Sequence, residues 1–221
     1  MNDPIDLRAR VLAAAASTPA PTRAEGRRRA LALASTSVVV AVGLFESIGG
    51  LAHSSGRPLH LTFAIAAGWA ASSALLTWVA LGRGRSTLGR RPGVLAAAAL
   101  LAPAAMFVWL HAFYGTFAEP FSRFGWRCLG YTIAMSVLPL GSFLALRRGT
   151  EPRSPAALGA AVGATCASWA GLLVDLWCPL NNAPHLLVGH VLPLVVVMLA
   201  GAAAGARVLA PRLRPPPSRP A

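Results

Sequence analysis

The sequence predicts an all-α membrane protein with six transmembrane helices and both termini in the cytoplasm. Of the 221 residues, 55% are hydrophobic and only 12% are charged, whereas about a quarter of the residues are charged in an ordinary soluble protein. Long apolar runs alternate with short segments rich in Arg, Gly and Pro. The basic residues, in turn, are concentrated in alternate connections, which is typical of a multi-pass protein.

Six apolar segments are long enough to cross the hydrocarbon core of a bilayer, which requires about 20 helical residues. The first follows an Arg-Arg-Arg cluster and continues without a convincing cleavage site, so we expect an uncleaved span and not a signal peptide. The connections contain helix breakers, as in HSSGRP and PLNNAPH, and are too short for a large soluble domain. We expect the spans near residues 30–52, 59–81, 94–114, 128–146, 156–178 and 186–206.

The spans divide the chain into three parts. We expect a cytoplasmic N-terminal tail over residues 1–29, a six-helix transmembrane domain over residues 30–206, and a cytoplasmic Arg/Pro-rich tail over residues 207–221.

Small residues and prolines distinguish the later spans. Gly159 and Gly163 in span five, and Gly201 and Gly205 in span six, have the spacing that lets two helices approach closely in a membrane. Spans three, four and six each contain a proline that we expect to kink the helix, namely Pro103, Pro139 and Pro193.

The arginines predict the orientation, because positively charged segments are retained on the cytoplasmic side. All 20 basic residues are Arg, and 17 of them lie in the two tails and in the second and fourth connections. Only Arg57, Arg123 and Arg127 lie on the other side. Nucleic acid is not needed to explain the net charge of +13, since aromatic residues do not interleave with the basic ones. The absence of Lys excludes Schiff-base chemistry with retinal or pyridoxal cofactors.

The N-terminal tail contains a candidate docking segment. Residues 5–16, IDLRARVLAAAA, can form a short helix, which the Pro-rich stretch after it would hold away from the membrane. The residues that we expect to contact a cytosolic partner are Ile5, Leu7, Arg8, Val11 and Leu12. The alternative is a disordered tail that only enforces topology and touches anionic lipid.

With this orientation, the reactive side chains gather at the outer side of the membrane. All five histidines fall there, together with Cys128 at the start of span four and Cys178 at the end of span five. The best intramembrane acids are Glu46 and Asp175, because buried carboxylates are costly in a bilayer and usually face the interior of the bundle. Asp175 precedes Cys178 by three residues, which places both on one helix face.

Three interpretations of this group are open. Thiolates and imidazoles suit a metal such as zinc or copper, and the four candidate ligands are Cys128, Cys178, His185 and His190. Alternatively, Cys128 and Cys178 form a disulfide, which the oxidising side of a bacterial inner membrane would permit. The third interpretation is that these polar residues simply populate the membrane interface. No CxxC or HExxH motif decides among them.

The second half of the chain resembles the NrsF-type family of six-span bacterial membrane anti-sigma factors. The resemblance covers roughly residues 126–206 and includes a Cys-Leu pair at the head of span four, a proline in that span and a cytoplasmic Arg-Arg-Gly followed by a proline. A Gly/Ala-rich fifth span then ends in a Cys-Pro pair. The matching residues are Cys128, Leu129, Pro139, Arg147, Arg148, Gly149, Pro155, Cys178 and Pro179.

The resemblance implies a multi-pass protein of the bacterial inner membrane that is not an enzyme. It implies that the N-terminal segment sequesters an extracytoplasmic-function sigma factor, with no direct contact to nucleic acid and no required cofactor. The family's two signal-responsive outer cysteines correspond to Cys128 and Cys178, although Trp177 stands where the family is expected to have a His. The Ala/Arg-rich composition is similar to that of myxobacterial members, which implies light-induced carotenoid genes as the regulon.

One alternative function comes from the outer Cys and His residues. They would also fit a membrane thiol or quinone oxidoreductase, or a metal-binding sensor. A fast thiol oxidoreductase usually carries a CxxC pair, which this sequence lacks.

Overall fold

A computed structural model describes residues 9, 13, 23–51, 57–82, 90–113, 124–147 and 152–210. The regular elements in these ranges are helical, with no strand among them. In chain order they are α2 (Arg23–Ser47), α3 (Leu59–Leu81), α4 (Pro92–Phe113), α5 (Trp126–Leu146), α6 (Pro155–Trp177), α7 (Ala183–Leu186), the π-helical segment η2 (Leu187–Val191) and α8 (Leu192–Val208). The all-helical class is therefore confirmed.

Five of the expected spans are long and apolar enough to cross a membrane. They are Leu59–Leu81, Pro92–Trp109, Trp126–Leu146, Pro155–Trp177 and Ala183–Val208, the last of which runs continuously through α7, η2 and α8. These five agree closely with the boundaries expected from hydropathy. The chain is therefore a multi-pass membrane protein.

The first expected span differs from the prediction at both ends. Helix α2 begins at Arg23, inside the arginine-rich segment, and ends at Ser47 instead of continuing to about residue 52. It ends there because Gly49 and Gly50 have positive φ angles of 110° and 51°, a conformation that stops a helix. Its apolar part, Leu31–Ser47, is about 25 Å long, slightly less than a hydrocarbon core of about 30 Å. That this first segment crosses the membrane stays a prediction.

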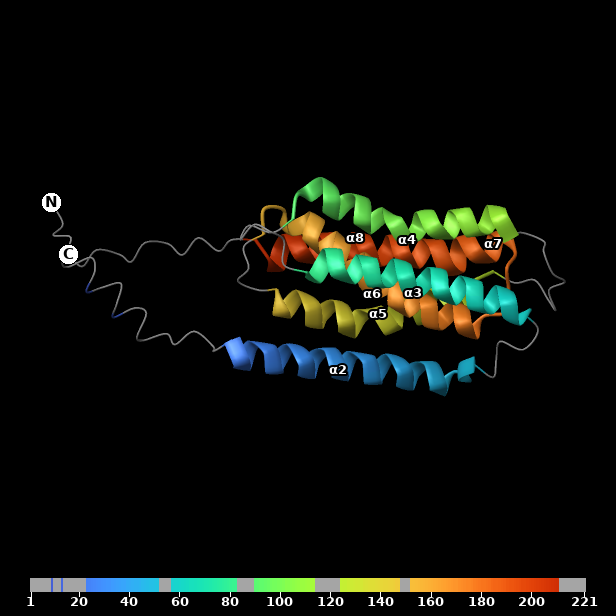
Figure 1. Cartoon of the computed structure of the whole chain (residues 1–221), viewed down its shortest axis with the longest axis horizontal. Helices are drawn as coiled ribbons and strands as arrows, with labels where there is room; N and C mark the ends of the chain where they lie inside the picture. The colour runs from blue at the N-terminus through green and yellow to red at the C-terminus, as the bar shows by residue number, and fades with distance from the viewer. Residues whose placement is uncertain are drawn as a thin grey trace.

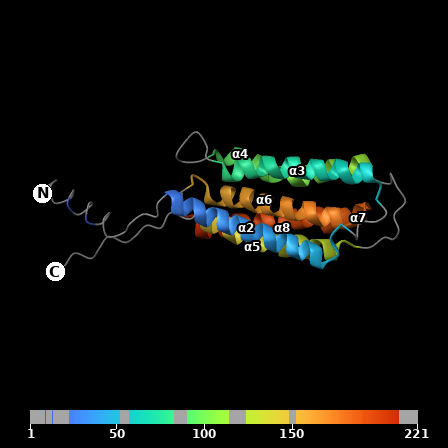
Figure 2. The ribbon, with the colours of Figure 1, turned by 60° about the horizontal axis from the view of Figure 1, so that its bottom comes forward.

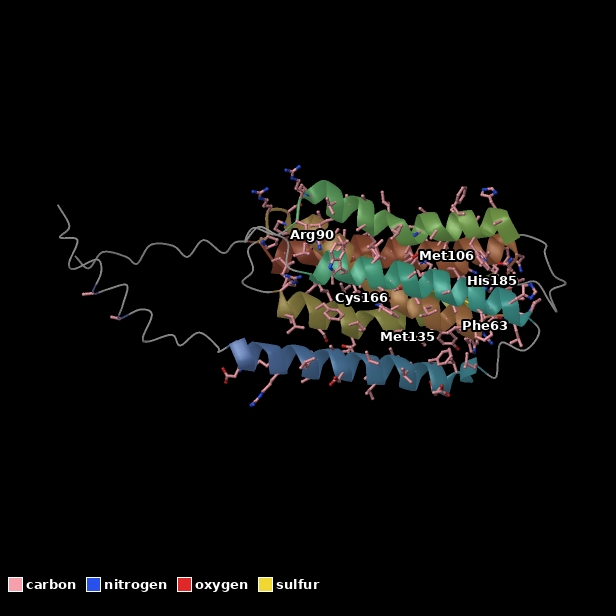
Figure 3. The ribbon with its side chains drawn as sticks, viewed as in Figure 1. Phe63, Arg90, Met106, Met135, Cys166 and His185 are labelled. Atoms are coloured by element: carbon pink, nitrogen blue, oxygen red, sulfur yellow. The ribbon has the colours of Figure 1, made fainter. Side chains whose placement is uncertain are left out.

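Helix α6 lies at the centre of the bundle and packs against all the other long helices. Figure 2 shows α3 and α4 together on one side of α6, with α2 and α5 on the other. In Figure 1 the start of α2 and the end of α8 lie at the same end of the bundle, and α7 lies at the opposite end. Figure 3 places Arg90 near the first of these ends and His185 near the other. This arrangement is compatible with the predicted orientation, which the structure leaves untested.

The central position of α6 depends on small residues. Ser154 caps the helix by accepting a hydrogen bond from the Ala157 amide, and Pro155 begins the first turn, where its missing N–H costs nothing. A Cβ added at Gly159 of α6, or at Gly201 of α8, would collide with the backbone of the facing helix. The predicted close approach of spans five and six is thus confirmed, and it brings backbone against backbone.

We expect Gly201→Ala to destabilise the bundle, because the added Cβ would meet the Cα of Gly163 at 3.0 Å and would lie even closer to the carbonyl oxygen of Gly159. Overpacking of this kind costs about 1–3 kcal/mol, or roughly 2–12 °C in Tm for a chain of this size. Thermal unfolding in detergent measures the change. Gly141→Ala on α5 is the matched control, since nothing lies within 4 Å of its added Cβ. Equal Tm values for both variants would contradict this account of the packing.

Candidate functional site

Four buried side chains from α5, the end of α6, α7 and η2 meet, and Figure 3 shows one of them, His185, at the end of the bundle where α7 lies. They are the thiols of Cys128 and Cys178 and the imidazoles of His185 and His190, and their potential ligand atoms all lie within 4.8 Å of one another. Each of the four residues is 1% exposed or less. The structure therefore brings together all four residues predicted as metal ligands, which we call the Cys/His cluster.

The end of α6 places the first thiol of the cluster. Cys178 still donates its amide to the carbonyl of Val174, at 2.9 Å, but its own backbone is already extended, with φ −90° and ψ 119°. The following Pro179 favours this conformation, because a residue before proline is disfavoured in a helix. The chain leaves the helix at the thiol, and the return to helix begins only at Ala183.

The two histidines are placed by a cap and by a π-helical turn. The side-chain oxygen of Asn182 accepts the amide of His185, at 3.0 Å, and so begins α7. Residues five apart in an ordinary α-helix differ by about 140° around the axis. In the π-helical segment, backbone hydrogen bonds join residues five apart, and His185 and His190 consequently approach with ring centroids 5.5 Å apart. Sequence periodicity gave no sign of this turn.

Two glycines let the start of α5 reach the cluster. A Cβ added at Gly125 would collide with the backbone of Gly189, and a Cβ added at Gly189 would meet the Cβ of Cys128 at 3.0 Å. Only residues without side chains permit this contact between the start of α5 and η2. It is this contact that brings Cys128 beside the histidines.

His185 lies between the two thiols. Its Nε2 atom is 3.4 Å from the sulfur of Cys128 and 3.1 Å from the sulfur of Cys178. All three cysteines lie in the described part of the chain, and none is in a disulfide; Cys166 is buried three turns away in the interior of α6, as expected. At the end of α6, the hydrogen bond from Cys128 and, to a smaller extent, that from His185 lower the pKa of the Cys178 thiol well below its ordinary value, against the opposing effect of burial.

A buried ion pair lies directly beside the cluster. Arg57, which precedes α3, donates through Nη1 to the Asp175 carboxylate at 2.9 Å and to the Asp175 backbone carbonyl at 3.2 Å. The other carboxylate oxygen of Asp175 is 3.8 Å from Nδ1 of His190. The sequence predicted Asp175 as a site residue but treated Arg57 only as a charge in a connection. The two are 118 positions apart, so no local pattern could have paired them.

Two tryptophans attach the neighbouring helices to this region. The indole N–H of Trp109 in α4 donates to the side-chain oxygen of Asn181 at 3.0 Å. The indole N–H of Trp177 donates to the carbonyl of Ile48, just after α2, at 2.9 Å. Phe45 of α2 also belongs to the buried cluster that contains both thiols. The region around the site is therefore attached to both α2 and α4.

The other predicted residues lie away from the cluster. Glu46 is exposed at the end of α2, beside Gly50, and does not join Asp175. The five candidate tail residues, Ile5, Leu7, Arg8, Val11 and Leu12, lie outside the described residues. Between them only Ala9 is described, and it is helical, as is Ala13 just beyond them.

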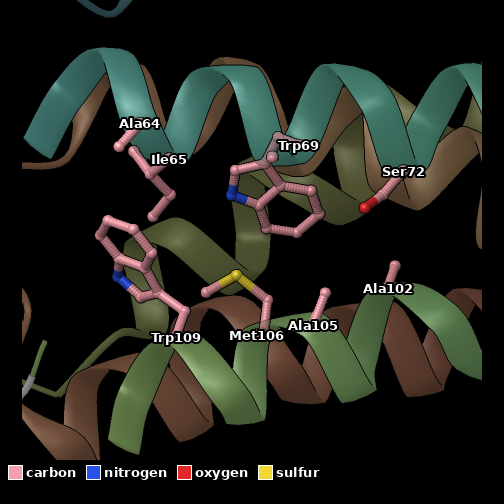
Figure 4. Close-up of a pocket in the computed structure, with 9 residues that line it drawn as sticks. Ala64, Ile65, Trp69, Ser72, Ala102, Ala105, Met106 and Trp109 are labelled. Carbon is pink, nitrogen blue, oxygen red and sulfur yellow. The ribbon is translucent and has the colours of Figure 1, made fainter. Parts of the chain in front are cut away.

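The sequence gave no sign of an apolar cavity between α3 and α4 (Figure 4). It has a volume of about 100 Å³ and is lined by Ile65, Trp69, Met106 and Trp109 among others. Its walls carry no charged group. The cavity adds nothing to the chemistry of the Cys/His cluster.

The fold and the site define a multi-pass helical membrane protein with a buried thiol–imidazole cluster near one end of its bundle. The chain matches the family model NrsF, described as negative regulator of sigma F, over residues 12–210. It therefore belongs to the NrsF family of anti-sigma factors, whose partner is a sigma factor and which is not a known enzyme family. No curated protein and no solved structure matches the chain.

We expect Arg57 and Asp175 to stabilise the fold as a pair. Replacing either one by Ala leaves a buried charge without its partner, which costs about 3–5 kcal/mol. The double replacement should cost clearly less than the sum of the two, measured as a double-mutant cycle of thermal or denaturant unfolding in detergent. Arg153→Ala, at an exposed arginine, is the control and should change little. Additive effects of the two single replacements would contradict the pairing.

Proposed function

We propose that the chain is an inner-membrane anti-sigma factor that sequesters an extracytoplasmic-function sigma factor through its N-terminal tail. The observation that carries the proposal is the family match over residues 12–210, which covers the described bundle and part of the tail. An anti-sigma factor has to bind its sigma factor in the resting state and lose that affinity when the signal arrives. It requires no catalysis of its own.

The arginine distribution supports a cytoplasmic position for the tail. Positively charged segments are retained in the cytoplasm, and 17 of the 20 arginines lie on the side that includes both tails. The sigma factor is a cytoplasmic protein, so the tail is the part of the chain that can meet it. Ile5, Leu7, Val11 and Leu12 supply the apolar contact, and Arg8 supplies a charge.

The Cys/His cluster is the proposed site of signal input. In Figure 1 the start of α2 lies at the opposite end of the bundle from α7, the helix that carries His185 of the cluster. In the proposed orientation the thiols lie near the outer side of the membrane, and the tail that binds the sigma factor lies in the cytoplasm. Trp177 and Phe45 connect this end of the bundle to α2, the helix that continues from the tail.

The finer resemblance to the myxobacterial carotenogenesis regulator CarR stays a hypothesis. It rests on composition and layout alone, and the family match supports neither that individual protein nor a carotenoid regulon. The oxidoreductase alternative is not favoured either, because the chain belongs to a family of regulators and its two thiols share a histidine instead of forming a CxxC pair.

Affinity capture of the intact chain from solubilised membranes tests the proposal. We expect a sigma factor to be recovered with the wild-type chain. Replacing Leu7 and Leu12 together by Asp should abolish recovery, because the loss of two buried leucines costs about 3–6 kcal/mol, which is at least about 100-fold in Kd.

Removal of residues 211–221 is the matched control for the capture experiment and should leave recovery unchanged. If no sigma factor accompanies the wild-type chain, the anti-sigma proposal is wrong. If the Leu7 and Leu12 variant captures as well as the wild type, only the assignment of the tail is wrong.

A further inference from the structure

We propose that Cys128, Cys178, His185 and His190 bind one zinc ion. The proposal is independent of the sigma factor, since it concerns a binding site within the bundle. It rests on the separations of the ligand atoms, on the burial of an imidazole that lacks hydrogen-bond partners, and on the charge of the site.

The separations match a tetrahedral ion. Zinc binds sulfur at about 2.3 Å and imidazole nitrogen at about 2.0–2.1 Å, so ligand atoms around it lie about 3.4–3.8 Å apart. The His185 nitrogen lies 3.4 Å and 3.1 Å from the two sulfurs, and all four ligand atoms lie within 4.8 Å of one another. Shifts of a few tenths of an ångström at His185, and a larger inward movement of the most distant ligand atom, would complete the coordination shell.

His190 provides independent evidence for a ligand. It is 1% exposed, and among the described residues neither of its ring nitrogens has a hydrogen-bond partner. A buried imidazole always carries at least one N–H, and leaving polar groups unpaired in the interior is costly. A metal ion bound to one nitrogen removes that cost.

Asp175 is placed to orient His190. Its carboxylate oxygen Oδ1 lies 3.8 Å from Nδ1 of His190 and has no hydrogen-bond partner in the described part of the chain. This leaves Nε2 of His190 for the metal and Nδ1 as the donor to the carboxylate, the arrangement that holds most metal-bound histidines in place. Arg57 neutralises Asp175 from its other side.

The charge of the filled site suits its surroundings. Two thiolates and one divalent ion sum to zero with two neutral imidazoles, and the neighbouring Arg57 and Asp175 also cancel. A neutral site avoids the high cost of an unpaired charge in a membrane protein interior. The ligand set also selects the ion, because thiolate with imidazole in a tetrahedral arrangement favours zinc, while calcium and magnesium require oxygen ligands.

The full-length chain in detergent tests the site without a sigma factor. We expect elemental analysis to find about one zinc per chain after purification. Cobalt(II) loaded in place of zinc should give the intense visible bands of a tetrahedral thiolate site, and added zinc should abolish them. A chain without bound zinc and without these bands would overturn the proposal whatever the variants do. Copper or iron in the site would overturn the assignment of the ion.

Variants then identify the ligands. Cys128→Ser and His190→Ala should each weaken zinc binding by about 10-fold or more, with helix content checked by circular dichroism. Cys166→Ser and His111→Ala are matched controls for loss of a thiol and of an imidazole, since Cys166 lies within α6 and His111 is exposed on α4. Cobalt bands that survive the combined Cys178→Ser and His190→Ala replacement would contradict the site. A Cys128–Cys178 disulfide in the purified chain, detected by alkylation before and after reduction, would contradict it as well.

Discussion

The close contact of α6 with α8 is the constraint on which the rest of the structure depends. In a bilayer no hydrophobic force drives helices together, so their association relies on packing and on small residues. Gly159, Gly163, Gly201 and Gly205 bring the two backbones together, which leaves no room for one helix to slide past the other. Every other long helix packs against α6. The register of this one pair therefore determines where the ends of the bundle meet.

The π-helical turn at the far end follows from that register. One end of the continuous helix through α7, η2 and α8 is fixed by glycine contacts, and its other end is fixed by the Asn182 cap. A helix whose two ends are fixed by separate contacts has to absorb any difference between its own length and rotation and those that the two contacts require. A single π turn does this by adding one residue to the turn. Here it also rotates His185 and His190 onto a common side, so the same distortion that accommodates the packing assembles the Cys/His cluster.

The helices, the close helix pair and the grouping of the Cys and His residues could be predicted from the sequence, whereas the Arg57–Asp175 pair and the exposure of Glu46 could not. Hydropathy, glycine spacing and the Cys-Pro pair predicted the helices, the close helix pair and the position of Cys178 just past Asp175. Hydropathy treats Glu46 and Asp175 alike, and only packing shows that one is exposed while the other pairs with Arg57. The end of α2 was predicted too late because apolar residues continue past Ser47, whereas the positive φ angles of Gly49 and Gly50 end the helix.

The position of α2 shows how a change at the thiols can reach the rest of the chain. Among its described contacts, α2 packs mainly on α5 and is joined to the bundle by Ser37 with Ser142 and by the Trp177 indole. Its Phe45 is buried among the same residues as both cysteines. Close-packed interiors transmit changes of volume because there is no free space to absorb them. If the thiols are the proposed site of signal input, a change in the separation of the two sulfurs would act on α2 at Phe45. A continuous helix of 25 residues would carry that displacement to Arg23 at the opposite end of the bundle.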